Sequence, residues 1–225
     1  MLLIQEPKPA ATATSFCTDP AWPAHAWLTM QARGLNAIHD DGVNLAIWRR
    51  SDAPSIAADD LETCDDVALT VAVPALATEI PAALAAAGYA ERERGLLAQD
   101  IVALGSQFAA LLDLDRVAVR LEVIETDACR RFHADYVAVR LISSYVGPGT
   151  QWLDNGDALA MAKGAEVAEL TIRSIATGDV ALFKGRDRTV APIVHRSPPV
   201  AATGERRLVL VIDPARADPA GAGSV

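Results

Sequence analysis

The sequence predicts an α+β protein in which a mainly helical N-terminal part packs on a C-terminal antiparallel β-domain. Two Ala- and Leu-rich stretches between residues 75 and 112 indicate the helices, and short apolar runs with turn signals from residue 117 onward indicate the strands. The third observation is a His-x-Asp pair, His133 and Asp135, with a distant His195 just before another strong strand pattern. A chain that returns to its first strand after several antiparallel strands is typical of a small barrel or jelly roll.

The composition is that of an acidic globular protein. The 225 residues are 51% hydrophobic and 22% charged, with a formal net charge of −9 and an isoelectric point near 4.9. A chain of this length can bury a substantial core. Nucleic-acid binding draws on clustered Lys and Arg, which this sequence scatters. We therefore expect no nucleic-acid partner.

The cysteines and the N-terminus indicate a cytoplasmic protein. Cys17, Cys64 and Cys129 are far apart and contain no Cys-x-x-Cys pair, so no disulfide framework is expected. The first residues lack the basic region and long apolar core of a signal peptide. No run reaches the ~18 continuous apolar residues of a spanning helix. We therefore expect no membrane association.

The chain is expected to divide into four parts. Residues 1–20 are rich in Pro, Ala and Thr and are expected to form a loose arm. Residues 21–115 form the mixed, mainly helical part, and residues 116–213 form the β-domain. Residues 214–225 are of low complexity and are expected to be a disordered tail.

Two helices are predicted in the N-terminal part, after a strand over residues 43–49. Residues 75–87 are dense in good helix formers and stop at Gly88. Residues 92–112 carry apolar side chains at steps of four and three, namely Leu97, Ile101, Leu104, Phe108 and Leu111. This stripe predicts one buried helix face against the outside of the β-domain.

The β-domain is predicted to begin with a half-buried strand over residues 117–123, where apolar and charged side chains alternate. A strand over residues 137–145 ends at the turn Gly147-Pro148-Gly149. The polar connection over residues 154–168 is a candidate lid. Further strands are predicted over residues 169–175, 180–183 and 208–212, the last covered on both faces because it is continuously apolar.

Two histidines and one carboxylate are the ligand set of a facial iron site. In an extended segment His133 and Asp135 project to the same side, so one strand could supply two ligands and His195 the third. The same alternation places Cys129 on that face. Cys129 is either a small wall residue or, as a thiolate, a ligand that would favour zinc.

The ordered set of His133-x-Asp135, a turn-rich middle, and His195 followed by Arg206 and Arg207 resembles the double-stranded β-helix dioxygenases that use Fe(II) and 2-oxoglutarate. The resemblance covers roughly residues 117–213 and implies a jelly-roll, cupin-like fold with hydroxylase-type activity. It implies that His133, Asp135 and His195 bind iron. It also implies that Arg207 or Arg206 pairs with the distal carboxylate of 2-oxoglutarate, and Arg207 is favoured because it begins the strand directly.

Tyr145 and Arg140, on the strand over residues 137–145, are further candidates for contact with the co-substrate, and the alternative is that they only pack and contact solvent.

Four phrases carry a second resemblance: NLAIWRR, CRRFHADYVAVRLISSYVGPGTQWL, DVALFKG and HRSPP. By these the chain is identified as a member of the bacterial family called domain of unknown function 1826. Some members are encoded near zinc-homeostasis GTPases, which implies a link to metal supply. No established reaction comes with the family, so the substrate, a small molecule or a protein side chain, stays open.

A second interpretation is a cupin-like zinc-binding or metal-homeostasis protein without turnover. Its ligands would be His133, His195, Asp135 and Cys129, because zinc accepts mixed tetrahedral ligation and a fourth protein ligand closes the site. A serine hydrolase has little support. The sequence has no Gly-x-Ser-x-Gly motif, and Ser197 beside His195 has no identifiable acid.

Overall fold

The structure is a computed structural model that describes residues 22–215. The expected N-terminal arm and nearly all of the expected C-terminal tail lie outside these residues.

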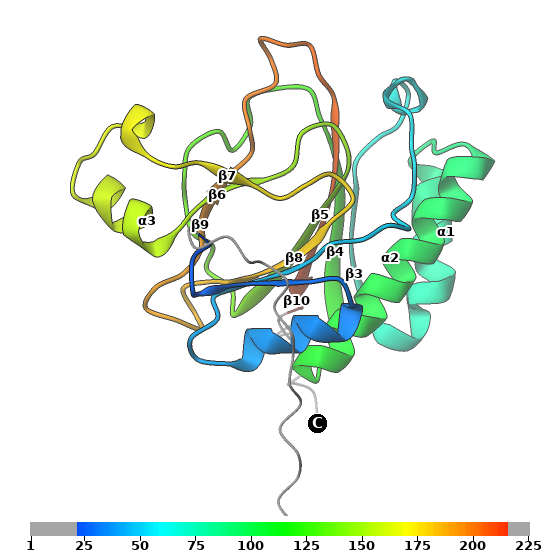
Figure 1. Ribbon diagram of the computed structural model, residues 1–225. Coiled ribbons are helices and arrows are strands. Elements are labelled where there is room, and N and C mark those ends of the chain that lie inside the picture. The colour runs from blue at the N-terminus through cyan, green and yellow to red at the C-terminus, as the bar shows by residue number, and fades with distance from the viewer. Residues whose placement is uncertain (1–21, 216–225) are drawn as a thin grey trace, which may run out of the picture.

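Two β-sheets form the centre of the protein (Figure 1). The larger sheet has the strand order β1-β2-β8-β5-β10-β4-β3, and its neighbours are antiparallel except for the parallel pair β1 and β2. Its strands are β1 (Ala26–Thr29), β2 (Leu45–Trp48), β3 (Val67–Ala72), β4 (Arg116–Ile124), β5 (Val139–Val146), β8 (Val180–Lys184) and β10 (Arg207–Pro214). The smaller sheet has the order β7-β6-β9, with β6 (Gln151–Leu153), β7 (Arg173–Ser174) and β9 (Val194–Arg196).

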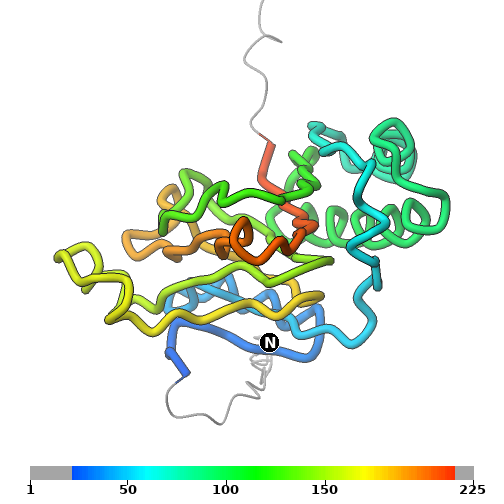
Figure 2. Tube along the Cα trace, turned by 90° about the horizontal axis from the view of Figure 1, so that it is seen from above, coloured from blue at the N-terminus to red at the C-terminus, as the bar shows by residue number. Residues whose placement is uncertain are grey.

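Helices cover one face of the larger sheet (Figures 1 and 2). Helices α1 and α2 pack on each other, and α2 also packs on β4 and β10. Gly88 ends α1 with a φ of 85°, a left-handed conformation that glycine adopts without a Cβ clash. The helices are η1 (Ala32–His39), η2 (Ala58–Leu61), η3 (Val73–Ala75), α1 (Leu76–Ala86), α2 (Glu91–Leu112), α3 (Asn155–Ala162) and η4 (Val167–Glu169).

Helix α2 is the one helix within residues 22–215 that is long and apolar enough to cross a membrane by length and composition alone. Its apolar side chains are used inside the protein. Leu97, Ile101, Leu104 and Phe108 are buried in the core between α2 and the larger sheet. This is the arrangement of a core helix.

Strand β10 separates two apolar cores. Successive side chains of a strand point to opposite faces. Leu208, Leu210 and Ile212 therefore lie in the core under α1 and α2, whereas Val209 and Val211 lie in the core between the two sheets. Full burial of each such side chain is worth about 1.5–3 kcal/mol. The continuously apolar pattern of this strand is explained by burial on both faces.

The N-terminal part supplies the expected strand near residues 43–49 as β2, and it also supplies β1 and β3. Strands β1, β2 and β3 all belong to the larger sheet, and β3 pairs with β4 in a register that places Val67 opposite Leu121. The predicted division near residue 115 therefore falls within a continuous sheet. Strands of four residues, such as β1, are too short to show a clear alternating pattern.

Candidate metal centre

The segment that carries His133 and Asp135 is a loop between β4 and β5. The expected extended strand is not formed there, and one isolated bridge fixes the loop instead. The backbone N–H of His133 donates to the carbonyl of His195 at 2.9 Å, and the N–H of His195 donates to the carbonyl of His133 at 2.8 Å. This pair of bonds brings the His-x-Asp loop against β9.

The three predicted ligands meet at one point. Their ligand atoms all lie within 4.8 Å of one another, and they form the one such group found among the described residues. Nε2 of His195 lies 3.3 Å from Oδ2 of Asp135, and Nε2 of His133 lies 3.7 Å from Oδ1. The β-bridge between the loop and β9 brings these residues together although they are distant in sequence.

Backbone carbonyls orient both imidazole rings. Nδ1 of His133 lies 2.9 Å from the carbonyl of Arg131, and Nδ1 of His195 lies 3.3 Å from the carbonyl of Ile193. A carbonyl oxygen only accepts hydrogen bonds, so these partners assign the proton of each neutral ring to Nδ1. Each Nε2 then presents a lone pair towards Asp135, as a metal-bound histidine does.

The electrostatics of the group favour a cation at its centre. Burial lowers the pKa of His195 to about 4, so this ring is neutral near pH 7. Oδ2 of Asp135 is buried and accepts no hydrogen bond within the described structure. A buried carboxylate oxygen without a donor is costly. Two ring lone pairs and this oxygen therefore converge where a divalent metal ion would satisfy all three.

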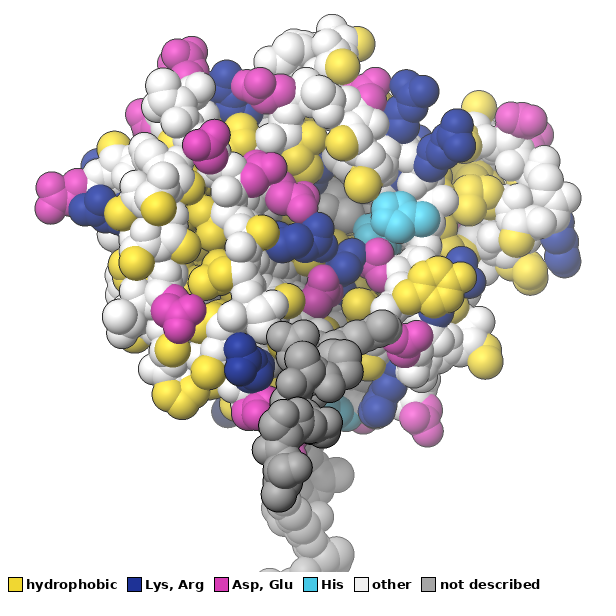
Figure 3. All heavy atoms as spheres, turned by 180° about the vertical axis from the view of Figure 1, so that it is seen from behind, with side chains coloured by type: hydrophobic (Ala, Val, Ile, Leu, Met, Phe, Trp, Pro, Cys, Tyr) yellow, Lys and Arg dark blue, Asp and Glu magenta, His cyan; other side chains and the backbone are white. Residues whose placement is uncertain are grey.

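A cavity of about 420 Å³ opens beside the triad and is lined by His133, His195, Cys129, Arg140 and Arg207, among others. The view in Figure 3 shows one face of the molecule, on which basic and acidic side chains gather next to a histidine. The cavity is large enough to hold small molecules beside the ligands.

Arg207 is a buried cation whose hydrogen-bond partners are all neutral. Its side chain donates to the carbonyl of Pro148 at 2.6 Å, to the hydroxyl of Ser197, and at 3.3 and 3.4 Å to the hydroxyls of Ser144 and Thr150. No described carboxylate lies within ion-pair distance of it. Burial lowers its pKa to about 10, which still leaves it charged at neutral pH, and Glu122 acts on it only through the electrostatic field, which opposes this lowering. The guanidinium is thus preorganised for an anion.

Arg206 points away from the cavity. It pairs with Glu125 at 2.6 Å and donates to the carbonyl of Ala58 at 2.8 Å. Of the two candidate arginines, the structure places Arg207 at the cavity and Arg206 outside it.

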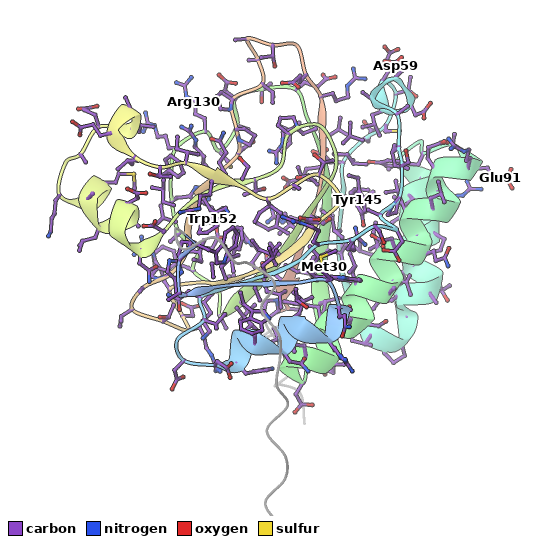
Figure 4. All side chains as sticks on the ribbon, viewed as in Figure 1. Met30, Asp59, Glu91, Arg130, Tyr145 and Trp152 are labelled. Atoms are coloured by element: carbon purple, nitrogen blue, oxygen red, sulfur yellow. The ribbon has the colours of Figure 1, made fainter. Side chains whose placement is uncertain are left out.

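Tyr145 is not brought to the triad. Its hydroxyl donates to Oδ2 of Asp100 on α2 at 2.7 Å, and Arg50 donates to the other oxygen of Asp100 at 2.6 Å. Figure 4 shows Tyr145 on the side of the larger sheet that faces α2. The expectation that Tyr145 contacts the co-substrate is therefore wrong. Side chains alternate along β5, so Arg140 and Tyr145 point to opposite faces of the sheet.

Cys129 lines the cavity but is not part of the ligand group. It is exposed, and its φ of 54° places it in a left-handed turn of the loop. This turn breaks the strand alternation that suggested a common face with His133.

The candidate lid contributes no residue to the cavity wall. Residues 154–172 form α3, η4 and their connections, and helix α3 has no buried residue. Figure 2 shows this segment projecting from the end of the molecule opposite α1 and α2.

Sequence reasoning missed the hydroxyl groups around Arg207. Ser197 lies two residues after His195 and therefore shares its face along an extended chain, which is a signal that could have identified it. Ser144 and Thr150 flank the turn at Gly147, where a Cβ would collide with the carbonyl of Arg206. This tight turn carries the carbonyl of Pro148 that accepts from Arg207.

The two-sheet fold and the convergent triad define a protein with a candidate metal-binding cluster beside a cavity. The chain belongs to the family described as protein of unknown function DUF1826, whose model matches residues 29–213. No curated protein sequence matches the chain significantly.

Several similar solved structures are dioxygenases. Dioxygenase for auxin oxidation 1 from Arabidopsis thaliana, bound to 2-oxoglutarate, is 10% identical with a TM-score of 0.43 over 74% of this chain and 68% of its own. The rice dioxygenase for auxin oxidation is 15% identical with a TM-score of 0.42 over 81% and 78% of the two chains. A Pseudomonas putida prolyl-4-hydroxylase is 18% identical with a TM-score of 0.33 over 74% and 98%. These scores are too low to identify a shared fold.

Proposed function

We propose that this protein is a non-haem Fe(II)- and 2-oxoglutarate-dependent oxygenase of the hydroxylase type. The observation that carries the proposal is the clustering of His133, Asp135 and His195 next to a cavity that is lined by His133, His195 and the buried cation Arg207. The triad and Arg207 complement each other, because the triad fits a divalent metal and the arginine fits a carboxylate.

The strand order supports a double-stranded β-helix as the fold that carries this function. From β5 onward the chain moves to the smaller sheet for β6 and β7, returns to the larger sheet at β8, crosses again for β9, and returns at β10. This alternation between two antiparallel sheets is the connectivity of a jelly roll.

The roles of the metal ligands follow from their geometry. His133 and His195 would each bind through Nε2, because Nδ1 is committed to a backbone carbonyl. Asp135 would bind through Oδ2, the oxygen without a hydrogen-bond donor. A bound Fe(II) would supply the redox chemistry that couples oxidation of 2-oxoglutarate by O2 to hydroxylation of a C–H bond. Three protein ligands on one side leave positions open to the cavity.

Arg207 would bind the distal carboxylate of 2-oxoglutarate. Its planar fork matches two carboxylate oxygens, and charge-assisted hydrogen bonds are stronger when water is excluded. The hydroxyls of Ser197, Ser144 and Thr150 hold the guanidinium in place. They are also able to donate to the same carboxylate once it is bound.

A closed zinc site is the competing function, and the position of Cys129 distinguishes the two. We expect Cys129→Ser to keep its metal, because the thiol is exposed and lies outside the ligand group. We also expect 2-oxoglutarate to bind only when a divalent metal is present, measured by calorimetry with Mn(II), which is not readily oxidised. Loss of stoichiometric Zn(II) in Cys129→Ser, together with no binding of 2-oxoglutarate, would establish the closed zinc site instead.

A further inference from the structure

Arg140 joins the candidate ligand Asp135 to a second carboxylate. From β5 it donates through one terminal nitrogen to Oδ1 of Asp135 at 2.7 Å. Through Nε and its other terminal nitrogen it binds both oxygens of Asp213, at the end of β10, at 2.7 Å each. The three side chains are only 12–15% exposed, so water competes weakly for these bonds.

This contact makes the two oxygens of Asp135 unequal. Oδ1 is held by Arg140, whereas Oδ2 has no hydrogen-bond donor and lies 3.3 Å from Nε2 of His195. A carboxylate with one oxygen committed to an arginine has one oxygen left for a metal. The arginine therefore determines both the rotation of the carboxylate and the number of oxygens it can offer.

We propose that Arg140, itself held by Asp213, is a positioning residue that fixes Asp135 as a one-oxygen metal ligand. This inference rests on the proposed function of the triad. It extends that function to two residues, Arg140 and Asp213, that are not themselves ligands. Keeping Asp135 to one oxygen leaves more coordination positions for the co-substrates.

Asp213 gives the arginine its orientation. Its bidentate pairing uses the planar fork of the guanidinium, which fixes the direction of the remaining terminal nitrogen. Arg120 approaches the same carboxylate at 3.6 Å but pairs more closely with Glu122, at 2.7 Å. Arg120 lines the same cavity, and its ion pairs within residues 22–215 are to Glu122 and Asp213 and not to Asp135, which makes it a matched control.

The direction in which metal affinity changes on replacing Arg140 distinguishes a positioning role from a purely electrostatic one. Removing a positive charge near a cation site strengthens metal binding if the arginine acts only through its field. Removing a residue that orients a ligand weakens metal binding, typically by about 10- to 100-fold. The two explanations therefore predict opposite changes for Arg140→Gln.

The experiment is a titration of metal-free protein with Co(II), following affinity and the visible bands that report coordination number. We expect Arg140→Gln to bind Co(II) about 10- to 100-fold more weakly, because Asp135 is no longer held in its orientation. We also expect altered visible bands, because Oδ1 is freed and Asp135 can then bind the metal through two oxygens. Arg140→Lys keeps the charge and a single bond, so it should recover part of the affinity. Arg120→Gln should bind at least as tightly as the wild type, with unchanged bands.

Unchanged or tighter binding by Arg140→Gln with wild-type bands would overturn the positioning role while leaving the metal site intact. If Arg140→Gln does not fold, Arg140→Lys with wild-type affinity and wild-type bands would overturn it equally. Failure of the wild type to bind Co(II) in a manner that needs His195 would instead refute the metal site, and the role of Arg140 with it.

Discussion

At the scale of single residues, the candidate centre depends on which atoms already have partners. Nδ1 of each histidine and Oδ1 of Asp135 are engaged, and the ligand atoms of the three residues lie within 4.8 Å of one another. Arg207 is a cation whose hydrogen-bond partners are neutral, so its guanidinium is not held in an ion pair. The positions of unsatisfied groups therefore indicate what the cavity would bind.

The ligand assignment predicts the effect of removing either ring. We expect His133→Ala and His195→Ala each to lose stoichiometric metal while keeping the fold, because both rings line the cavity. Equilibrium dialysis with Fe(II) under anaerobic conditions measures the loss, and circular dichroism checks the fold.

His25→Ala is the matched control for these variants. Nε2 of His25 accepts a hydrogen bond from the backbone N–H of Asn155, and the ring is outside the ligand group. Metal stoichiometry should therefore be unchanged in this variant. A His195→Ala protein that still binds one metal per chain would refute the assignment.

Residue identity in the sequence predicted the triad but not its surroundings. The order of His133, Asp135 and His195 was sufficient to propose a common site. Tyr145 was wrongly expected at the same site as Arg140. The two residues are five positions apart on one strand, and this odd spacing places their side chains on opposite faces. The hydroxyls of Ser144 and Thr150 gave no distinguishing signal because Ser and Thr have many structural roles.

At the scale of elements, strand β10 connects the site to the rest of the fold. It begins with Arg207 at the cavity, ends next to Asp213, and buries leucines under α2 between them. A single strand thus supplies both Arg207, the proposed partner of the co-substrate carboxylate, and Asp213, the partner of Arg140, and it contributes to both cores.

This position predicts a large cost for truncating Leu210. Its side chain is fully buried in the core under α1 and α2, so Leu210→Ala should lower the free energy of unfolding by about 2–5 kcal/mol. The same substitution at Leu159, which is 55% exposed on α3, should change it by less than about 0.5 kcal/mol. Urea denaturation measures both, and equal effects would contradict the core described for β10.

The long elements were predictable from the sequence, as were the short strands β2 and β8, expected over residues 43–49 and 180–183, whereas the shortest strands were mostly not. The expected helix over residues 92–112 corresponds to α2 (Glu91–Leu112) and the expected strand over residues 208–212 to the centre of β10, because their apolar patterns extend over several residues. Strands β6, β7 and β9 have two or three residues each. Of the strand expected over residues 169–175 only β7 forms, and β6 and β9 are set by pairing between distant segments, which a local pattern does not encode.

At the scale of the whole molecule, an acidic chain encloses a cavity with basic groups. The formal net charge is −9, yet the cavity wall includes the four arginines Arg120, Arg140, Arg196 and Arg207. Two of these, Arg120 and Arg140, are paired with acids, whereas Arg207 is not. The proposed binding of a small anionic co-substrate therefore depends on Arg207 and not on the net charge of the chain.

The most direct test of this account is an anaerobic titration of metal-free protein with Fe(II) and then 2-oxoglutarate, followed by visible absorption. We expect a charge-transfer band that needs both additions, is lost or strongly weakened in Arg207→Ala, and persists in Arg206→Ala, since Arg206 pairs with Glu125 outside the cavity. The absence of any band in the wild type, or an equal loss in both variants, would contradict the proposed oxygenase site.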